Sequence, residues 1–139
     1  MVRASGSRRV ATTCEGGLFD TRGLITRYYE SLNAKDDGWK SLWAADAIFS
    51  DAPKTLHAQG SDAVIESFGP FLRGVGSVEV VSSIVEGPDA CFVIRYTYVN
   101  RRSETLVQDV AEVWEVRGGA LSSLTLYFDL TAHRSFILG

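Results

Sequence analysis

The stretch SVEVVSSIVEGPDACFVIRYTYVNRRSETLVQDVAEVWEVRGGALSSLTLYFDL, residues Ser77–Leu130, decides the fold. Polar and apolar residues alternate along most of it, and short connectors rich in turn-forming residues interrupt the alternation. This pattern is typical of strands joined by tight turns. The predicted strands are Ser77–Glu86, Ala90–Asn100, Glu104–Val116 and Ala120–Leu130. Because each connector is too short for a crossover, we expect an antiparallel meander.

The residues before this stretch favour helices and two short strands. Apolar side chains at helical spacing predict a first helix, with Asp20 or Thr21 as its N-cap. These side chains are Leu24, Ile25, Tyr28, Tyr29 and Leu32. Two further helices are predicted, one before and one after a pair of short strands at Ala47–Asp51 and Thr55–Gln59.

Helices followed by long strands indicate an α+β protein with its helices on one face of the sheet. We predict a cone-shaped barrel, in which a strongly bent antiparallel sheet wraps around the N-terminal helices. Residues 18–139 are expected to form this single domain, since no repeat or second pattern interrupts them. Residues 1–17 are small and polar, and we expect them to be a flexible leader.

Composition narrows the classes of partner. The chain has 14 Lys and Arg against 17 Asp and Glu, which gives a net charge of −3. An acidic body without a basic stripe argues against nucleic acid, and no apolar run is long enough to cross a membrane. The two cysteines, Cys14 and Cys91, make a poor disulfide framework because one lies in the leader. Reduced thiols favour a cytoplasmic protein.

Asp51 is a lone carboxylate at the end of an apolar segment. Side chains alternate between the faces of a strand, so Phe49 and Asp51 share one face. A carboxylate on an aromatic-lined face loses hydration, which suits a general base. An Asp before Ala-Pro is also a good turn starter. The residues leave both interpretations open.

Four short strings resemble the nuclear transport factor 2-like superfamily, and within it the SnoaL-like polyketide cyclases and the ketosteroid isomerases. The strings are RYYESLNAKD at Arg27–Asp36, AIFSD at Ala47–Asp51, EVWEVRGG at Glu112–Gly119 and YFD at Tyr127–Asp129. The resemblance covers roughly residues 18–130. It implies the fold, but it does not imply the reaction, because this fold hosts both enzymes and simple binders.

The resemblance to ketosteroid isomerase implies three catalytic positions. The general base falls on Asp51, and the tyrosine of the oxyanion hole falls on Tyr28. The second oxyanion donor, a carboxylic acid kept neutral by an apolar site, falls on Glu112, where this chain has Glu in place of Asp. SnoaL-type cyclases also place a carboxylate on this strand. From the residues alone, Tyr28 could also be an ordinary core residue. Glu112 lies on an apolar strand face, and a carboxyl is rarely buried among apolar neighbours without a purpose.

Two other subfamilies of this superfamily suggest roles for further residues of the chain. Limonene-type epoxide hydrolases are similar around Arg95, but their two catalytic aspartates correspond to Thr97 and Leu126, which cannot activate water. Arg95 is therefore expected either to serve the pocket or to pair with a neighbour on the sheet face. Polyether-forming epoxide cyclases use a Glu near Glu79, which is a weaker candidate because a register shift of one residue changes its face.

The expected pocket is mostly hydrophobic. Its predicted lining is Trp43, Phe49, Phe68, Arg95, Trp114, Leu124, Leu126 and Phe128. His57 could lie at the pocket mouth, although a surface histidine is the plainer interpretation. His57 and His133 have no companions at the spacing of a metal site, and no cofactor motif is present. The apolar tail Phe136–Leu138 is expected to fold over the cavity mouth or to join a dimer interface.

These observations predict a cofactor-independent acid–base enzyme that acts on a hydrophobic multi-ring or polyketide-type small molecule. A cyclase of natural-product biosynthesis is the first choice. The alternatives are a ketosteroid isomerase-like isomerase, an epoxide-opening polyether-type cyclase, and a binding domain without catalysis. A homodimer formed through the outer sheet face is also expected.

Overall fold

The computed structural model describes residues 20–54 and 56–138 of the chain. The predicted leader, with Cys14, lies outside these ranges, and Cys91 is a free thiol. The elements in order are α1 (Thr21–Ala34), the 3₁₀ helix η1 (Gly38–Leu42), β1 (Trp43–Asp51), β2 (His57–Gln59), α2 (Ser61–Arg73), β3 (Val75–Glu86), β4 (Asp89–Val99), β5 (Thr105–Arg117), β6 (Ala120–Tyr127) and α3 (Leu130–Leu138).

The strands form one six-stranded sheet in the order β2-β1-β6-β5-β4-β3. Strands β3 to β6 pair antiparallel in sequence order, which confirms the predicted meander. Strand β1 pairs parallel with β6, so the sheet is mixed and not antiparallel throughout. A parallel neighbour needs a long connection, and the chain supplies one because β2, α2 and the first three strands of the meander lie between β1 and β6.

Helix α1 begins and ends as its sequence dictates. The Asp20 side chain caps it by accepting a hydrogen bond from the backbone N–H of Gly23 at 2.7 Å. Lys35 adopts a left-handed conformation (φ 59°) at its C-terminus. The Asn33 side chain exchanges two hydrogen bonds with the backbone of Val78, at 2.6 and 2.9 Å. This amide therefore ties the end of α1 to β3.

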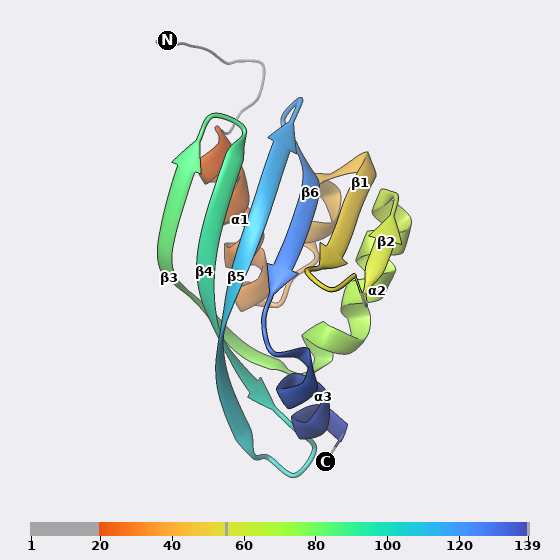
Figure 1. Ribbon diagram of the computed structural model, residues 1–139, viewed down its shortest axis with the longest axis vertical. Helices are drawn as coiled ribbons and strands as arrows, with labels where there is room; N and C mark the ends of the chain where they lie inside the picture. Colours follow the sequence, from red (N-terminus) through yellow and green to blue (C-terminus); the bar gives the residue numbers. More distant parts are fainter. Residues whose placement is uncertain (1–19, 55, 139) are drawn as a thin grey trace.

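The helices lie on one face of the sheet, as the α+β pattern predicts. Figure 1 shows α1 behind the meander and α2 behind the edge formed by β1 and β2. Irregular register within the β3–β4 and β5–β6 pairs bends the sheet around them. The inner face of β4 is apolar and aromatic, with Phe92, Ile94, Tyr96 and Tyr98 all buried.

The C-terminal segment departs from the predicted pattern. The strand expected at Ala120–Leu130 ends at Tyr127, and α3 begins at Leu130. Asp129 stops the strand because its side chain accepts a hydrogen bond from the N–H of Ala132 at 2.9 Å, which caps the new helix. In Figure 1, α3 lies below the end of β6 and beside the tip of the β4–β5 hairpin. None of the helices in the described ranges is long and apolar enough to cross a membrane.

Candidate active site

A cavity of about 520 Å³ lies between the inner face of the sheet and helices α1, α2 and α3. Five residues of the predicted lining do line it: Phe49, Phe68, Leu124, Leu126 and Phe128. Helix α3 contributes a further wall, which includes His133 and Ile137. The C-terminal tail therefore folds over the cavity, which confirms the first of the two arrangements predicted for it. The lining is predominantly apolar, so its few polar groups decide its chemistry.

Glu112 is the buried carboxyl group of this cavity. It lies on β5 with only 2% of its surface exposed, on the same strand face as Trp114. Its two oxygens accept hydrogen bonds from the hydroxyls of Tyr29 and Tyr96, each at 2.5 Å. The indole N–H of Trp114 in turn donates to the Tyr29 hydroxyl at 2.9 Å. Three side chains from two strands and one helix thus hold the carboxyl in place.

Burial controls the ionisation of Glu112. It raises the pKa of this carboxyl from its ordinary value of 4.5 to about 7, against the opposing effect of the two tyrosine donors. Burial and the charge of Glu112 raise the pKa values of Tyr29 and Tyr96 well above 10, so both phenols stay protonated as donors. The sequence predicted this upward direction for Glu112. A carboxyl that titrates near neutral pH can both take up and release a proton.

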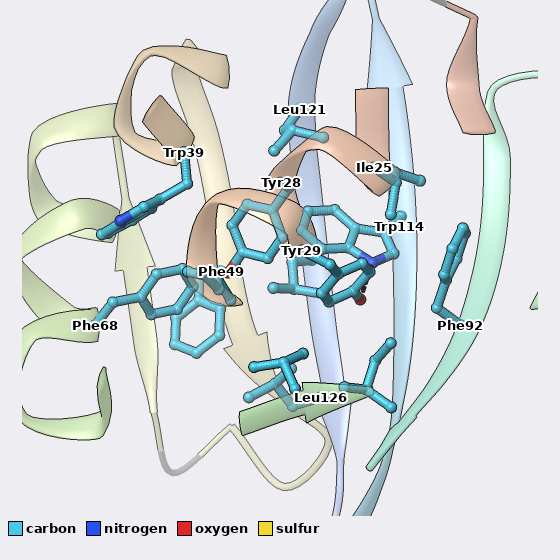
Figure 2. Close-up of a cluster of buried hydrophobic side chains, with 14 of the residues drawn as sticks. Ile25, Tyr28, Tyr29, Trp39, Phe49, Phe68, Phe92, Trp114, Leu121 and Leu126 are labelled. Atoms are coloured by element: carbon cyan, nitrogen blue, oxygen red, sulfur yellow. Dashed lines mark hydrogen bonds between the residues drawn. The ribbon is translucent and has the colours of Figure 1, made fainter. Parts of the chain in front are cut away.

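Tyr28 lies at the centre of the aromatic cluster (Figure 2). Its ring makes edge contacts with Trp43 and Trp114, with centroid distances of 5.8 and 5.0 Å, and it lines the cavity. Burial and the nearby charge of Glu112 raise the pKa of the Tyr28 phenol. Tyr28 therefore offers a protonated donor to a ligand oxygen.

Asp51 is buried to 1% exposure, but it is not among the residues that line the cavity. Its Oδ1 accepts a hydrogen bond from the N–H of Leu56 at 2.9 Å, and its carbonyl accepts one from Lys54 at 2.9 Å. These bonds confirm that Asp51 starts the turn after β1. Its Oδ2 is buried with no partner in the part of the chain that the structure describes. Leu56, which Asp51 holds, does line the cavity.

The predicted pocket roles of Arg95 and Glu79 are wrong. Arg95 is exposed on the outer sheet face and binds Asp109 through two hydrogen bonds of 2.9 and 3.2 Å. Glu79 is exposed opposite it on β3. The reason is strand alternation: Tyr96 occupies the inner face of β4, so its neighbour Arg95 must face outward.

Trp43 and Trp114 are buried, but they support the cavity from behind and do not line it. Both pack against Tyr28 and against each other, with 5.7 Å between their ring centroids. Their predicted lining role is therefore wrong. His57 does line the cavity while remaining exposed, which agrees with a place at its mouth.

Sequence reasoning missed five polar residues of the site: Tyr29, which binds Glu112, and the lining residues Ser67, Tyr96, His133 and Arg134. The signal for Tyr96 was present, because Phe92, Ile94, Tyr96 and Tyr98 repeat at every second position of β4. His133 gave no such signal, since its position depends on α3 folding back. Among the described residues, no three His, Cys, Asp or Glu side chains are grouped in a way that could hold a metal ion.

The comparison with protein-family models matches residues 25–124 to the SnoaL-like domain. The chain belongs to the SnoaL-like family. Its match spans α1 to β6, and therefore includes Tyr28 and Glu112. The comparison with curated proteins found no matching sequence.

Solved structures with the same fold share little sequence with this SnoaL-like protein. A candidate SnoaL-like polyketide cyclase from Jannaschia sp. CCS1 has a TM-score of 0.73 at 14% identity, with 89% of this chain and 96% of that chain covered. TerC, crystallised with polyporic acid, has a TM-score of 0.71 at 17% identity, covering 86% and 98%. A protein with a ketosteroid isomerase-like fold from Catenulispora acidiphila DSM 44928, in complex with trimethylamine, has a TM-score of 0.69 at 14% identity, covering 84% and 93%. At these identities the similarity shows the fold alone.

Proposed function

We propose that this protein is a cofactor-independent acid–base enzyme acting on a hydrophobic multi-ring or polyketide-type small molecule. The observation that carries the proposal is Glu112, a buried carboxyl with a pKa of about 7 in a predominantly apolar cavity. An apolar cavity with few polar groups favours a substrate of fused rings. The crystal structure of TerC with polyporic acid supports a small organic ligand for this fold.

In the proposed mechanism, Glu112 removes a proton from the carbon next to a substrate carbonyl. The C–H electron pair moves into the carbonyl, and the Tyr28 hydroxyl donates to the oxygen that becomes negative. In a cyclisation, the enolate carbon then attacks a second carbonyl, and Glu112 returns the proton to the new alkoxide. In an isomerisation, Glu112 returns it to a different carbon. Cyclisation is our first choice and isomerisation the second.

Asp51 is the second candidate for the base. The family resemblance assigns it this role, and its buried Oδ2 without a described partner supports the assignment. The cavity supports Glu112 instead, because Glu112 lines it and Asp51 does not. The two assignments therefore predict different rates for Glu112→Gln and Asp51→Asn, which keep the shape of each side chain and remove its charge.

Deuterium uptake from D₂O by 2-tetralone, followed by mass spectrometry, tests proton transfer without assuming the later step. We expect Glu112→Gln to slow uptake by roughly 100-fold or more, as is usual for loss of a general base. Asp51→Asn serves as the matched control and should stay near the wild-type rate. Wild-type uptake in Glu112→Gln would contradict the proposal. A loss confined to Asp51→Asn would assign the base to Asp51.

Conversion of a β,γ-unsaturated ketosteroid to its conjugated isomer, measured by ultraviolet absorbance, separates the two reactions. Turnover that Glu112→Gln abolishes would move isomerisation ahead of cyclisation. Deuterium exchange without isomerisation would favour a cyclase that acts through an enolate.

We also propose that the protein is a cytoplasmic homodimer joined through the outer sheet face. Support for the dimer comes from apolar side chains exposed on adjacent strands of that face, where Ile48, Val113 and Tyr127 are each at least 40% exposed. The cytoplasmic setting rests on the sequence. A dimer on this face would leave the cavity, which lies on the opposite face, open to substrate.

A further inference from the structure

His133 is a second buried polar group of the cavity. Helix α3 places its imidazole in the lining, with 9% of its surface exposed. Its Nε2 has no hydrogen-bond partner within the described ranges. A buried polar nitrogen without a partner costs free energy, so natural proteins seldom keep one without a reason.

A row of aromatic contacts connects His133 to Glu112. The rings of Tyr96 and Tyr98 stack along the inner face of β4, with centroids 5.7 Å apart and an interplanar angle of 10°. Tyr96 donates to Glu112 at one end, and the His133 ring contacts Tyr98 edge-on at 4.5 Å at the other. The two stacked rings therefore join Glu112 at one end to His133 at the other, and the Tyr98 hydroxyl between them is also buried without a partner among the described residues.

The fold fixes the position of His133. The backbone N–H of His133 donates to the backbone carbonyl of Asp129 at 3.2 Å, and this hydrogen bond belongs to the first turn of α3. The side chain of Gln108 on β5 donates to the same carbonyl at 3.0 Å. Farther along α3, the Ile137 side chain packs so closely on Gly74 that a Cβ at Gly74 would lie 2.8 Å from Ile137 Cδ1. Contacts before and after His133 in the chain thus hold helix α3, and with it the imidazole, against the cavity.

We propose that His133 is a substrate-binding residue whose Nε2 hydrogen-bonds an oxygen at the end of the ligand remote from Glu112. The cavity would then select fused-ring ligands that carry oxygen at both ends. This inference rests on the proposed function for the orientation of the ligand, with its reacting end at Glu112. Burial lowers the pKa of His133, so the ring is neutral at pH 7 and suits a hydroxyl or carbonyl.

Two probes that differ by one hydroxyl test the inference: 2-naphthol and 2,6-dihydroxynaphthalene. We expect the wild-type protein to bind the diol about fivefold or more tightly than the naphthol, the increment of one buried hydrogen bond. His133→Phe should bind the naphthol as before and lose the preference for the diol. Titration calorimetry measures all four affinities.

Ser135→Ala is the matched control, because Ser135 lies on the same helix, is exposed and is not among the residues that line the cavity. It should keep the preference for the diol. His133→Gln, which restores a polar atom, should recover part of it and covers the case in which His133→Phe does not fold. The ¹⁵N resonance of His133 Nε2 should shift with the diol and not with the naphthol.

Equal affinity of the wild-type protein for the two probes would overturn the inference, and so would failure to bind either probe. Survival of the preference in His133→Phe would also overturn it. The deuterium-uptake assay separates this failure from that of the proposed function. A diol preference that depends on His133, without any uptake that depends on Glu112, would reject the catalytic proposal alone.

Discussion

The hydroxyls of Tyr29 and Tyr96 and the burial of Glu112 act in opposite directions on the same carboxyl. Burial favours the neutral form, while the two donors favour the ionised form, and the balance places the pKa of Glu112 at about 7. Trp114 orients one donor by binding the Tyr29 hydroxyl. A side chain placed in this way is suited to move a proton in both directions near neutral pH.

The pKa of Glu112 predicts how stability depends on pH. Between its ordinary value of 4.5 and about 7, the folded protein binds a proton that the unfolded chain has released. The free energy of unfolding should therefore fall as pH rises through this window, by about 3 kcal/mol from this group. Urea denaturation at pH 5 and pH 8 measures the change.

Glu112→Gln is the control for this prediction, because an amide of the same shape does not titrate. Its stability should fall less between the two pH values than that of the wild-type protein. Equal changes in the two proteins would mean that Glu112 titrates at the same pH in the folded and unfolded states, which contradicts its buried position.

Single residues show where sequence reasoning succeeds. Glu112 was predictable because strand alternation places it on the same face as Val110 and Trp114. The same rule, applied to Tyr96, places Arg95 outside, where it pairs with Asp109, as one of its two predicted roles required. Asp51 satisfies the turn interpretation, and its catalytic role stays a prediction.

At the scale of the elements, α3 completes the cavity. It depends on Asp129, whose side chain accepts the N–H of Ala132 and so caps the helix. We expect Asp129→Ala to lower the free energy of unfolding by about 1 kcal/mol, the usual loss for an N-cap. It should also increase amide hydrogen exchange in α3. Asp129→Asn, which keeps an oxygen acceptor, should resemble the wild-type protein, and an unchanged α3 in Asp129→Ala would contradict the role of the cap.

The elements were predictable to the extent that their signals are local. Helical spacing predicted α1, and alternation with short turns predicted the meander β3–β6. The parallel pairing of β1 with β6 is a contact between distant segments, which no local pattern specifies. Helix α3 was not predicted because polar and apolar residues alternate up to Tyr127, as in a strand. The capping role of Asp129 becomes visible only in the structure, where the residues after it form a helix.

At the scale of the whole molecule, the sheet separates two surfaces with different roles. Its inner face and the helices enclose the cavity, and its outer face exposes the apolar side chains of the proposed dimer interface. We expect the wild-type protein to be a dimer in multi-angle light scattering and Val113→Lys to be largely monomeric, because a buried unpaired charge opposes association. Ala63→Lys, on the exposed side of α2 and away from the outer sheet face, should remain a dimer. A monomeric wild-type protein at micromolar concentration would contradict the interface.

The central claim is that the cavity holds a carboxyl ready to exchange a proton near neutral pH. Carbon-13 NMR of the glutamate side-chain carboxyls, with Glu112→Gln to assign the resonance, tests it most directly. We expect the Glu112 carboxyl to titrate with a midpoint near 7. A midpoint at the ordinary acidic value for glutamate would show that Glu112 is a fixed carboxylate at neutral pH, and would contradict the claim.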